Sequence, residues 1–131
     1  MSEAEFAVTL RDWARAEGLL AKATQLTPDT GAYWLSLGTT RMRLNNRAGA
    51  KQAYEQALKA FEEEAEATKN DPEPVLRQVY VLALLGRVDD GRALLDKTAK
   101  RFPDNRVVRA FVDAKQLDKL IAQPDFKQVA L

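Results

Sequence analysis

Residues 31–64, GAYWLSLGTTRMRLNNRAGAKQAYEQALKAFEEE, decide the fold of this chain. The stretch predicts a helix, a tight turn and a second helix. The residues at helical spacing on the two facing surfaces are Trp34, Leu37, Gly38, Ala50, Tyr54 and Ala57. We interpret them as packing residues, with Gly38 a point of close approach between helices, rather than as ligand contacts. The stretch therefore predicts a helical hairpin.

The same residues resemble the tetratricopeptide (TPR) repeat, W-x2-L-G followed by A-x3-F, with a period of about 34 residues. One period earlier the pattern falls on Trp13, Ala16, Leu20, Ala23 and Pro28. A third frame starts at residue 72 and matches Gly86, Leu95 and Pro103, provided that residues 65–71 are an insertion that lengthens the preceding helix. The resemblance implies an all-α fold, a right-handed superhelical array of antiparallel helix pairs (a TPR-like α-solenoid).

The repeat frame predicts a single TPR domain over residues 1–131, with about three repeats. It comprises a partial repeat at 3–30, repeats at 31–64 and 72–105, a capping helix at about 104–122 and a short tail at 123–131. Seven helices are expected, near 2–10, 12–26, 30–44, 47–69, 72–85, 88–102 and 104–122. We expect the tail to fold back as one short turn or helix through Phe126 and Val129.

Local signals support several of these boundaries. Asp71 is expected to cap the helix that begins at Pro72, a residue that suits the first helical turn. Gly86 suits a left-handed helix end. Gly91 stands where the repeat prefers alanine and predicts a second close approach of helices.

Composition argues against catalysis and against nucleic-acid binding. The 20 basic and 19 acidic residues give a net charge of +1, whereas a nucleic-acid surface normally has a strong basic excess. The chain has neither His nor Cys, which removes the common nucleophile–base pairs and metal ligands. No phosphate-binding glycine motif and no G-x-S-x-G occurs. We predict no enzyme activity, no cofactor and no metal site.

The sequence also predicts no membrane span, because no apolar run approaches the roughly 18 residues required. The lack of cysteine fits the cytoplasm and the periplasm equally well, so the compartment stays open.

TPR arrays bind extended peptides in a concave groove lined by the first helix of each repeat, and the resemblance implies such a groove here. Carried over by position, the groove candidates are Leu35, Thr39, Arg43, Leu76, Arg77, Tyr80 and Phe111. The set is mainly apolar and includes two arginines, which suits an apolar peptide with an acidic group. The predicted function is a protein–protein interaction scaffold that binds a peptide or partner segment.

Two alternatives remain open at this point. The groove residues Leu35, Leu76 and Phe111 are equally suited to be covered by a preceding helix, a neighbouring domain or a second copy. The alternative function is a structural or assembly segment of a larger TPR protein, for example in the bacterial envelope or a secretion system, with no groove ligand of its own. Under that alternative we expect further repeats before Met1 or a homo-oligomer.

Overall fold

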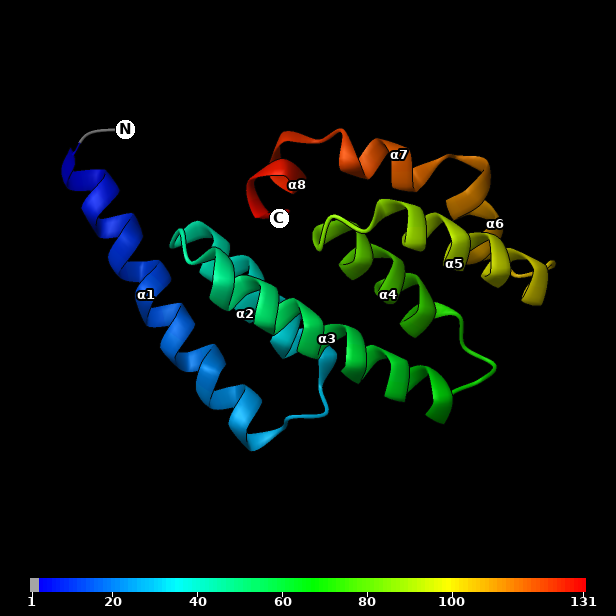
Figure 1. Cartoon of the computed structure of the whole chain (residues 1–131), viewed down its shortest axis with the longest axis horizontal. Helices are drawn as coiled ribbons and strands as arrows, with labels where there is room; N and C mark the ends of the chain where they lie inside the picture. Colours follow the sequence, from blue (N-terminus) through cyan, green and yellow to red (C-terminus); the bar gives the residue numbers. More distant parts are fainter. Residues whose placement is uncertain (1–2) are drawn as a thin grey trace.

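Helices make up the fold, and residues 3–131 contain eight of them and no strand (Figure 1). The computed structural model describes the backbone of residues 3–131 and the side chains of residues 10–131. The helices are α1 (Glu3–Leu26), α2 (Gly31–Arg43), α3 (Arg47–Ala67), α4 (Glu73–Leu84), α5 (Val88–Arg101), α6 (Arg106–Asp113), α7 (Gln116–Ile121) and α8 (Pro124–Val129). The expected all-α class is confirmed. Within the described residues, no helix combines the length and the apolar character needed to cross a membrane.

The first helix, α1, is a single helix of 24 residues. The prediction of two helices at 2–10 and 12–26 was therefore wrong. The expected break came from the repeat frame, whereas the local sequence around Arg11 has no Gly or Pro to interrupt a helix. Arg41 ties α1 to the rest of the chain, because its guanidinium group binds the Glu17 carboxylate at 3.3 Å and the Gly49 carbonyl oxygen at 3.1 Å.

Helices α2 and α3 form the predicted hairpin. The packing residues Leu37, Ala50, Tyr54 and Ala57 are no more than 1% exposed. The Tyr54 ring lies directly against the backbone of Gly38, where a Cβ atom would overlap the ring. The interpretation of Gly38 as a close-approach position is thus confirmed.

Helix α3 continues past Glu64, as the predicted lengthening of this helix requires, and ends at Ala67. Its final turn closes through a hydrogen bond from the Thr68 N–H to the Glu64 carbonyl oxygen. In the turn before α4, the Asp71 carboxylate accepts a hydrogen bond from the Glu73 N–H at 3.0 Å. Asp71 thus accepts a hydrogen bond from the first residue of α4, but Pro72 occupies the N-cap position and the helix begins one residue later than expected.

Helices α4 and α5 form a second hairpin. Gly86, in the turn between them, has the predicted left-handed conformation, with φ of +79°. A Cβ atom on Gly91 would lie 3.3 Å from the carbonyl oxygen of Val79, so α5 approaches α4 closely at this glycine. Gln78, which stands at the position of Leu37 in the preceding hairpin, donates a buried hydrogen bond to the Phe61 carbonyl oxygen.

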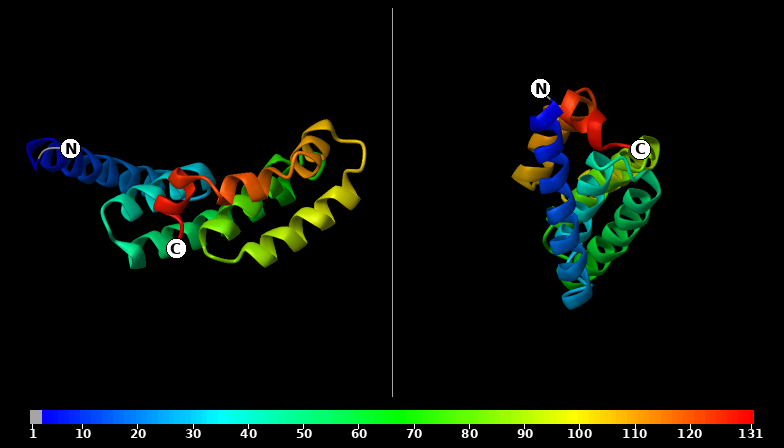
Figure 2. Two further views of the ribbon diagram at one scale, coloured as in Figure 1. Left: turned by 90° about the horizontal axis from the view of Figure 1, so that it is seen from above. Right: turned by 90° about the vertical axis from the view of Figure 1, so that its left-hand side faces the viewer.

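The C-terminal part of the chain folds into three short helices rather than one long cap. The expected continuous helix at 104–122 was wrong, because Lys115 adopts a left-handed conformation with φ of 52° and separates α6 from α7. The bend buries Leu117, and Asp118 then forms an ion pair with Arg92 of α5. Figure 2 shows α6, α7 and α8 running back from α5 toward α2. The expected short helix in the tail is confirmed as α8.

Candidate functional site

The C-terminal helix α8 is seated where α2, α3 and α4 come together (Figures 1 and 2). We name the surface beneath it the α8 seat, which comprises Arg43, Tyr54, Tyr80 and Leu84. Two apolar side chains of α8, Phe126 and Val129, are only 7% and 5% exposed. The rings of Tyr80 and Phe126 are 6.1 Å apart and inclined by 60°, a favourable tilted arrangement for an aromatic pair. The seat therefore accommodates Phe126 and, three positions later, Val129.

Two hydrogen bonds fix the backbone at the end of α8. The Tyr54 hydroxyl donates to the Val129 carbonyl oxygen at 2.6 Å. The Leu131 N–H donates to the Leu84 carbonyl oxygen at 2.8 Å. Leu84 is the last residue of α4, where carbonyl groups have no partner within the helix. These bonds involve only the backbone of the bound segment, so they do not depend on its side chains.

Arg43 forms the exposed rim of the seat. Its guanidinium group donates to the side-chain oxygen of Gln128 at 3.4 Å. The same group lies 4.9 Å from the centre of the Trp13 ring, a cation–π distance. Arg43 thus contacts α8 and α1 at the same time.

Both tyrosines of the seat keep their protons at neutral pH. Burial is the main cause of the raised pKa of Tyr54, the nearby Tyr80 raises it further, and Arg43 lowers it. Burial also raises the pKa of Tyr80. The Tyr54 hydroxyl therefore remains available as a hydrogen-bond donor.

A hollow of about 380 Å³ lies at the opposite ends of the same helices, beside Arg77. Its lining residues are Ala32, Phe61, Glu64, Ala67, Thr68, Asp71, Glu73, Pro74 and Arg77. We name it the Arg77 hollow.

Arg77 holds two partners in this hollow. Its guanidinium group is 2.9 Å from the Glu73 carboxylate and 5.9 Å from the centre of the Phe61 ring. Burial raises the pKa of Glu64, against an opposing effect of Arg77. Because the Arg77–Glu73 pair is exposed, it is weak enough to exchange partners. A carboxylate ligand would have to compete with Glu73 for Arg77.

Three of the seven predicted groove residues lie in these two places, and the other four lie in neither. Arg43 and Tyr80 belong to the α8 seat, and Arg77 lies in the hollow. The half-buried members that pack against the core are Leu35, Leu76, Tyr80 and Phe111. The Thr39 hydroxyl bonds to the Ser36 carbonyl oxygen of its own helix at 3.0 Å. Phe111 is carried by α6, whose main neighbours are α5 and α7.

Sequence reasoning missed Tyr54 as a contact residue and assigned it to packing alone. The signal was present, because tyrosine stands where the repeat pattern has phenylalanine. A buried tyrosine hydroxyl requires a hydrogen-bond partner. The partner is the carbonyl oxygen of Val129, 75 residues further along the chain.

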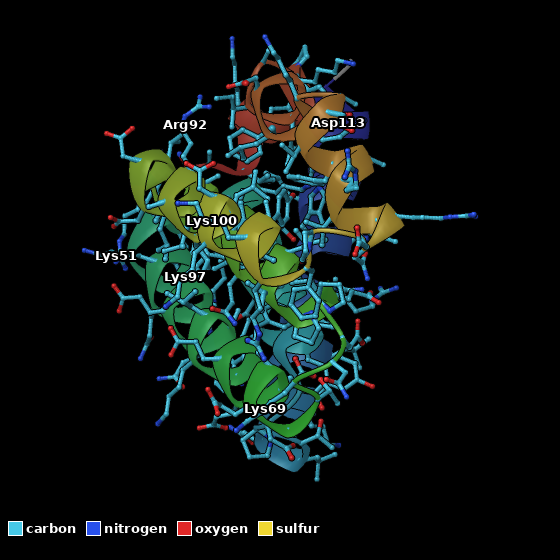
Figure 3. The ribbon with its side chains drawn as sticks, turned by 90° about the vertical axis from the view of Figure 1, so that its right-hand side faces the viewer. Lys51, Lys69, Arg92, Lys97, Lys100 and Asp113 are labelled. Atoms are coloured by element: carbon cyan, nitrogen blue, oxygen red, sulfur yellow. The ribbon has the colours of Figure 1, made fainter. Side chains whose placement is uncertain are left out.

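The outer side of α3 and α5 carries a second hollow, of about 340 Å³. Figure 3 shows this side of the molecule, with Lys51 on α3 and Lys97 and Lys100 on α5. Acidic side chains of Glu62 and Glu66 line the same hollow as Lys97, so the charges are mixed. Among the residues that the structure describes, no group of three or more acidic side chains is arranged to hold a metal ion.

Comparisons with known proteins add no further assignment. No protein-family model matches the chain, and neither a curated protein nor a solved structure shows significant similarity to it.

Proposed function

We propose that this chain is a protein–protein interaction scaffold, an array of TPR-like helix pairs whose inner face binds a segment of a partner protein. The inner face is the surface of α2 and α4 that includes the α8 seat and the Arg77 hollow. The observation that carries the proposal is α8 itself, a short amphipathic helix held on this face by Tyr54 and Tyr80.

The chemistry of the face suits recognition of a helical segment. It offers an aromatic ring, a buried hydroxyl donor and a helix-end carbonyl that accepts a hydrogen bond from outside its own helix. Docking of an amphipathic helix into an apolar groove uses side chains spaced by three or four residues. Phe126 and Val129 have this spacing, and a partner segment of the same type would make the same contacts.

The test is a capture experiment with the double variant Tyr80→Ala/Arg77→Ala. Proteins captured from an extract of the source cells are identified, and the binding segment of each is titrated against both chains. We expect the double variant to bind the segment at least about tenfold more weakly, since each removed side chain lies on the inner face.

The control is Tyr33→Ala/Arg87→Ala, which removes the same two residue types from outside the inner face. Tyr33 is exposed on α2, and Arg87 pairs with Asp90 as Arg77 pairs with Glu73. Equal affinity of the Tyr80/Arg77 variant and the wild type for every captured segment would refute the proposal.

An assembly role is a second candidate, and exposed leucines on α1 favour it. Leu19 and Leu26 are 65% and 75% exposed, and their spacing of seven residues places them on one face of the helix. Such a face suits packing against another helix. Sedimentation of the wild type and of Leu19→Glu/Leu26→Glu tests this role. A monomeric wild type at high protein concentration would exclude self-association through α1.

A further inference from the structure

We infer that α8 is a displaceable occupant of the inner face, and that it competes with a partner helix of the same pattern, an aromatic residue followed three positions later by a β-branched residue. The inference rests on the proposed function, because it names the partner class and the regulation of that site. The contacts between α8 and its seat carry it.

The first step of the argument is the size of α8. The helix has six residues, and helices this short are not stable alone in water. Its conformation is therefore maintained by the seat. Loss of a few contacts would release the segment and expose the surface that it covers.

The second step is that these contacts are few and transferable. They are one aromatic pair, the burial of Phe126 and Val129, the packing of Ala130 and Leu131 against the core, the two backbone hydrogen bonds from Tyr54 and to Leu84, and the exposed bond from Arg43. None of them is covalent or depends on the connection through α7. A separate chain with phenylalanine and valine at the same spacing could form all of them.

The third step concerns affinity. A segment tethered by a short connection has an effective concentration in the millimolar range. When the seat is open in only one molecule in a hundred, a competing segment binds with an apparent dissociation constant about 100-fold weaker than its intrinsic value. The seated tail thereby weakens the apparent affinity of every competing segment, so only a segment with high intrinsic affinity for the seat displaces it.

The experiment measures binding of a fluorescent peptide of residues 123–131, QPDFKQVAL, to the full chain by anisotropy. The chains compared are the wild type, Phe126→Ala and Val129→Thr, each checked for folding by circular dichroism. Val129→Thr replaces one methyl group by a hydroxyl of similar size, so it weakens seating with little risk to the fold. We expect both variants to bind the peptide at least about tenfold more tightly than the wild type.

Two controls assign the binding to the seat. A peptide in which Phe126 is replaced by alanine should lose most of its affinity. Adding Tyr80→Ala to the Phe126→Ala chain should abolish the gain. Equal binding to the wild type and the variants, or no binding to either folded variant, would overturn the inference.

The two proposals fail in different ways. A captured partner segment that depends on Tyr80 and Arg77 but does not displace the peptide would overturn the inference and leave the scaffold function standing. Peptide binding that follows the expected order would support the inference even if no captured protein depended on Tyr80 and Arg77, a result that refutes the scaffold function.

Discussion

Replacing Tyr54 by phenylalanine isolates a single contact of the α8 seat. The substitution removes the hydroxyl that donates to the Val129 carbonyl oxygen at 2.6 Å. The ring stays, so its packing against Gly38 and the core is retained. We therefore expect α8 to loosen while the α2–α3 hairpin remains intact.

The size of the effect follows from the loss of one buried hydrogen bond. Such a bond contributes about 1 kcal/mol, and leaving its carbonyl partner unpaired raises the cost toward about 2 kcal/mol. A free-energy change of about 1–2 kcal/mol alters the ratio of open to closed α8 about 5- to 30-fold. The seat would then open 5 to 30 times more often.

Amide hydrogen exchange measures this opening directly. The Leu131 N–H bonds to the Leu84 carbonyl oxygen only while the tail is seated, so its exchange rate reports the open state. We expect the Leu131 amide to exchange about 5- to 30-fold faster in Tyr54→Phe, with α3 amides unchanged. Tyr33→Phe, at an exposed position, should change neither rate. Unchanged exchange at Leu131 in Tyr54→Phe would refute the role of Tyr54 in holding α8.

Three further predictions concern the scaffold. Gly38→Ala should destabilise the chain by about 1–3 kcal/mol in urea unfolding, because the new methyl group meets the Tyr54 ring. Gly18→Ala, with open space around it, should stabilise the chain by about 0.5–1 kcal/mol. Equal effects of the two substitutions would contradict the close packing of Tyr54 on Gly38. Arg41→Ala should speed amide exchange in α1 but not in α3, since it removes the tie to Glu17; uniform exchange would show that α1 is held elsewhere. Burial raises the folded-state pKa of Tyr54, so the unfolded chain loses the phenol proton first, near its ordinary value of about 10. Its contribution to stability is complete below that pH and falls as pH rises above it, so the melting temperature of the wild type should drop more steeply than that of Tyr54→Phe between pH 9 and 11; parallel curves would refute the shift.

Local sequence signals were sufficient to predict the structure where one residue type determines the backbone conformation. Gly86 predicted a left-handed turn, and Gly38 predicted a close approach that the Tyr54 ring now explains. The missing breaker after residue 64 predicted the long α3, and Asp71 predicted the start of α4. In each case the signal lies within a few residues of the feature.

The rest depended on contacts between residues far apart in the sequence. Lys115 is neither Gly nor Asn, so no local signal predicts its left-handed conformation. The bend at Lys115 accompanies the burial of Leu117. The seating of α8 depends on Tyr54 and Tyr80, 75 and 46 positions before their partners Val129 and Phe126. The repeat pattern predicted a groove that includes Arg43 and Tyr80, but it could not show that the chain's own tail packs on these residues.

The central claim is that α8 occupies the inner face and gives way to a segment of the same pattern. The ring centres of Tyr80 and Phe126 lie 6.1 Å apart. The most direct measurement is the nuclear Overhauser effect between these two rings in the isotope-labelled full chain. We predict cross-peaks between the two rings in the free chain that fade as unlabelled QPDFKQVAL peptide is titrated to saturation. Cross-peaks that are absent from the free chain, or that persist unchanged at saturation, would contradict the claim.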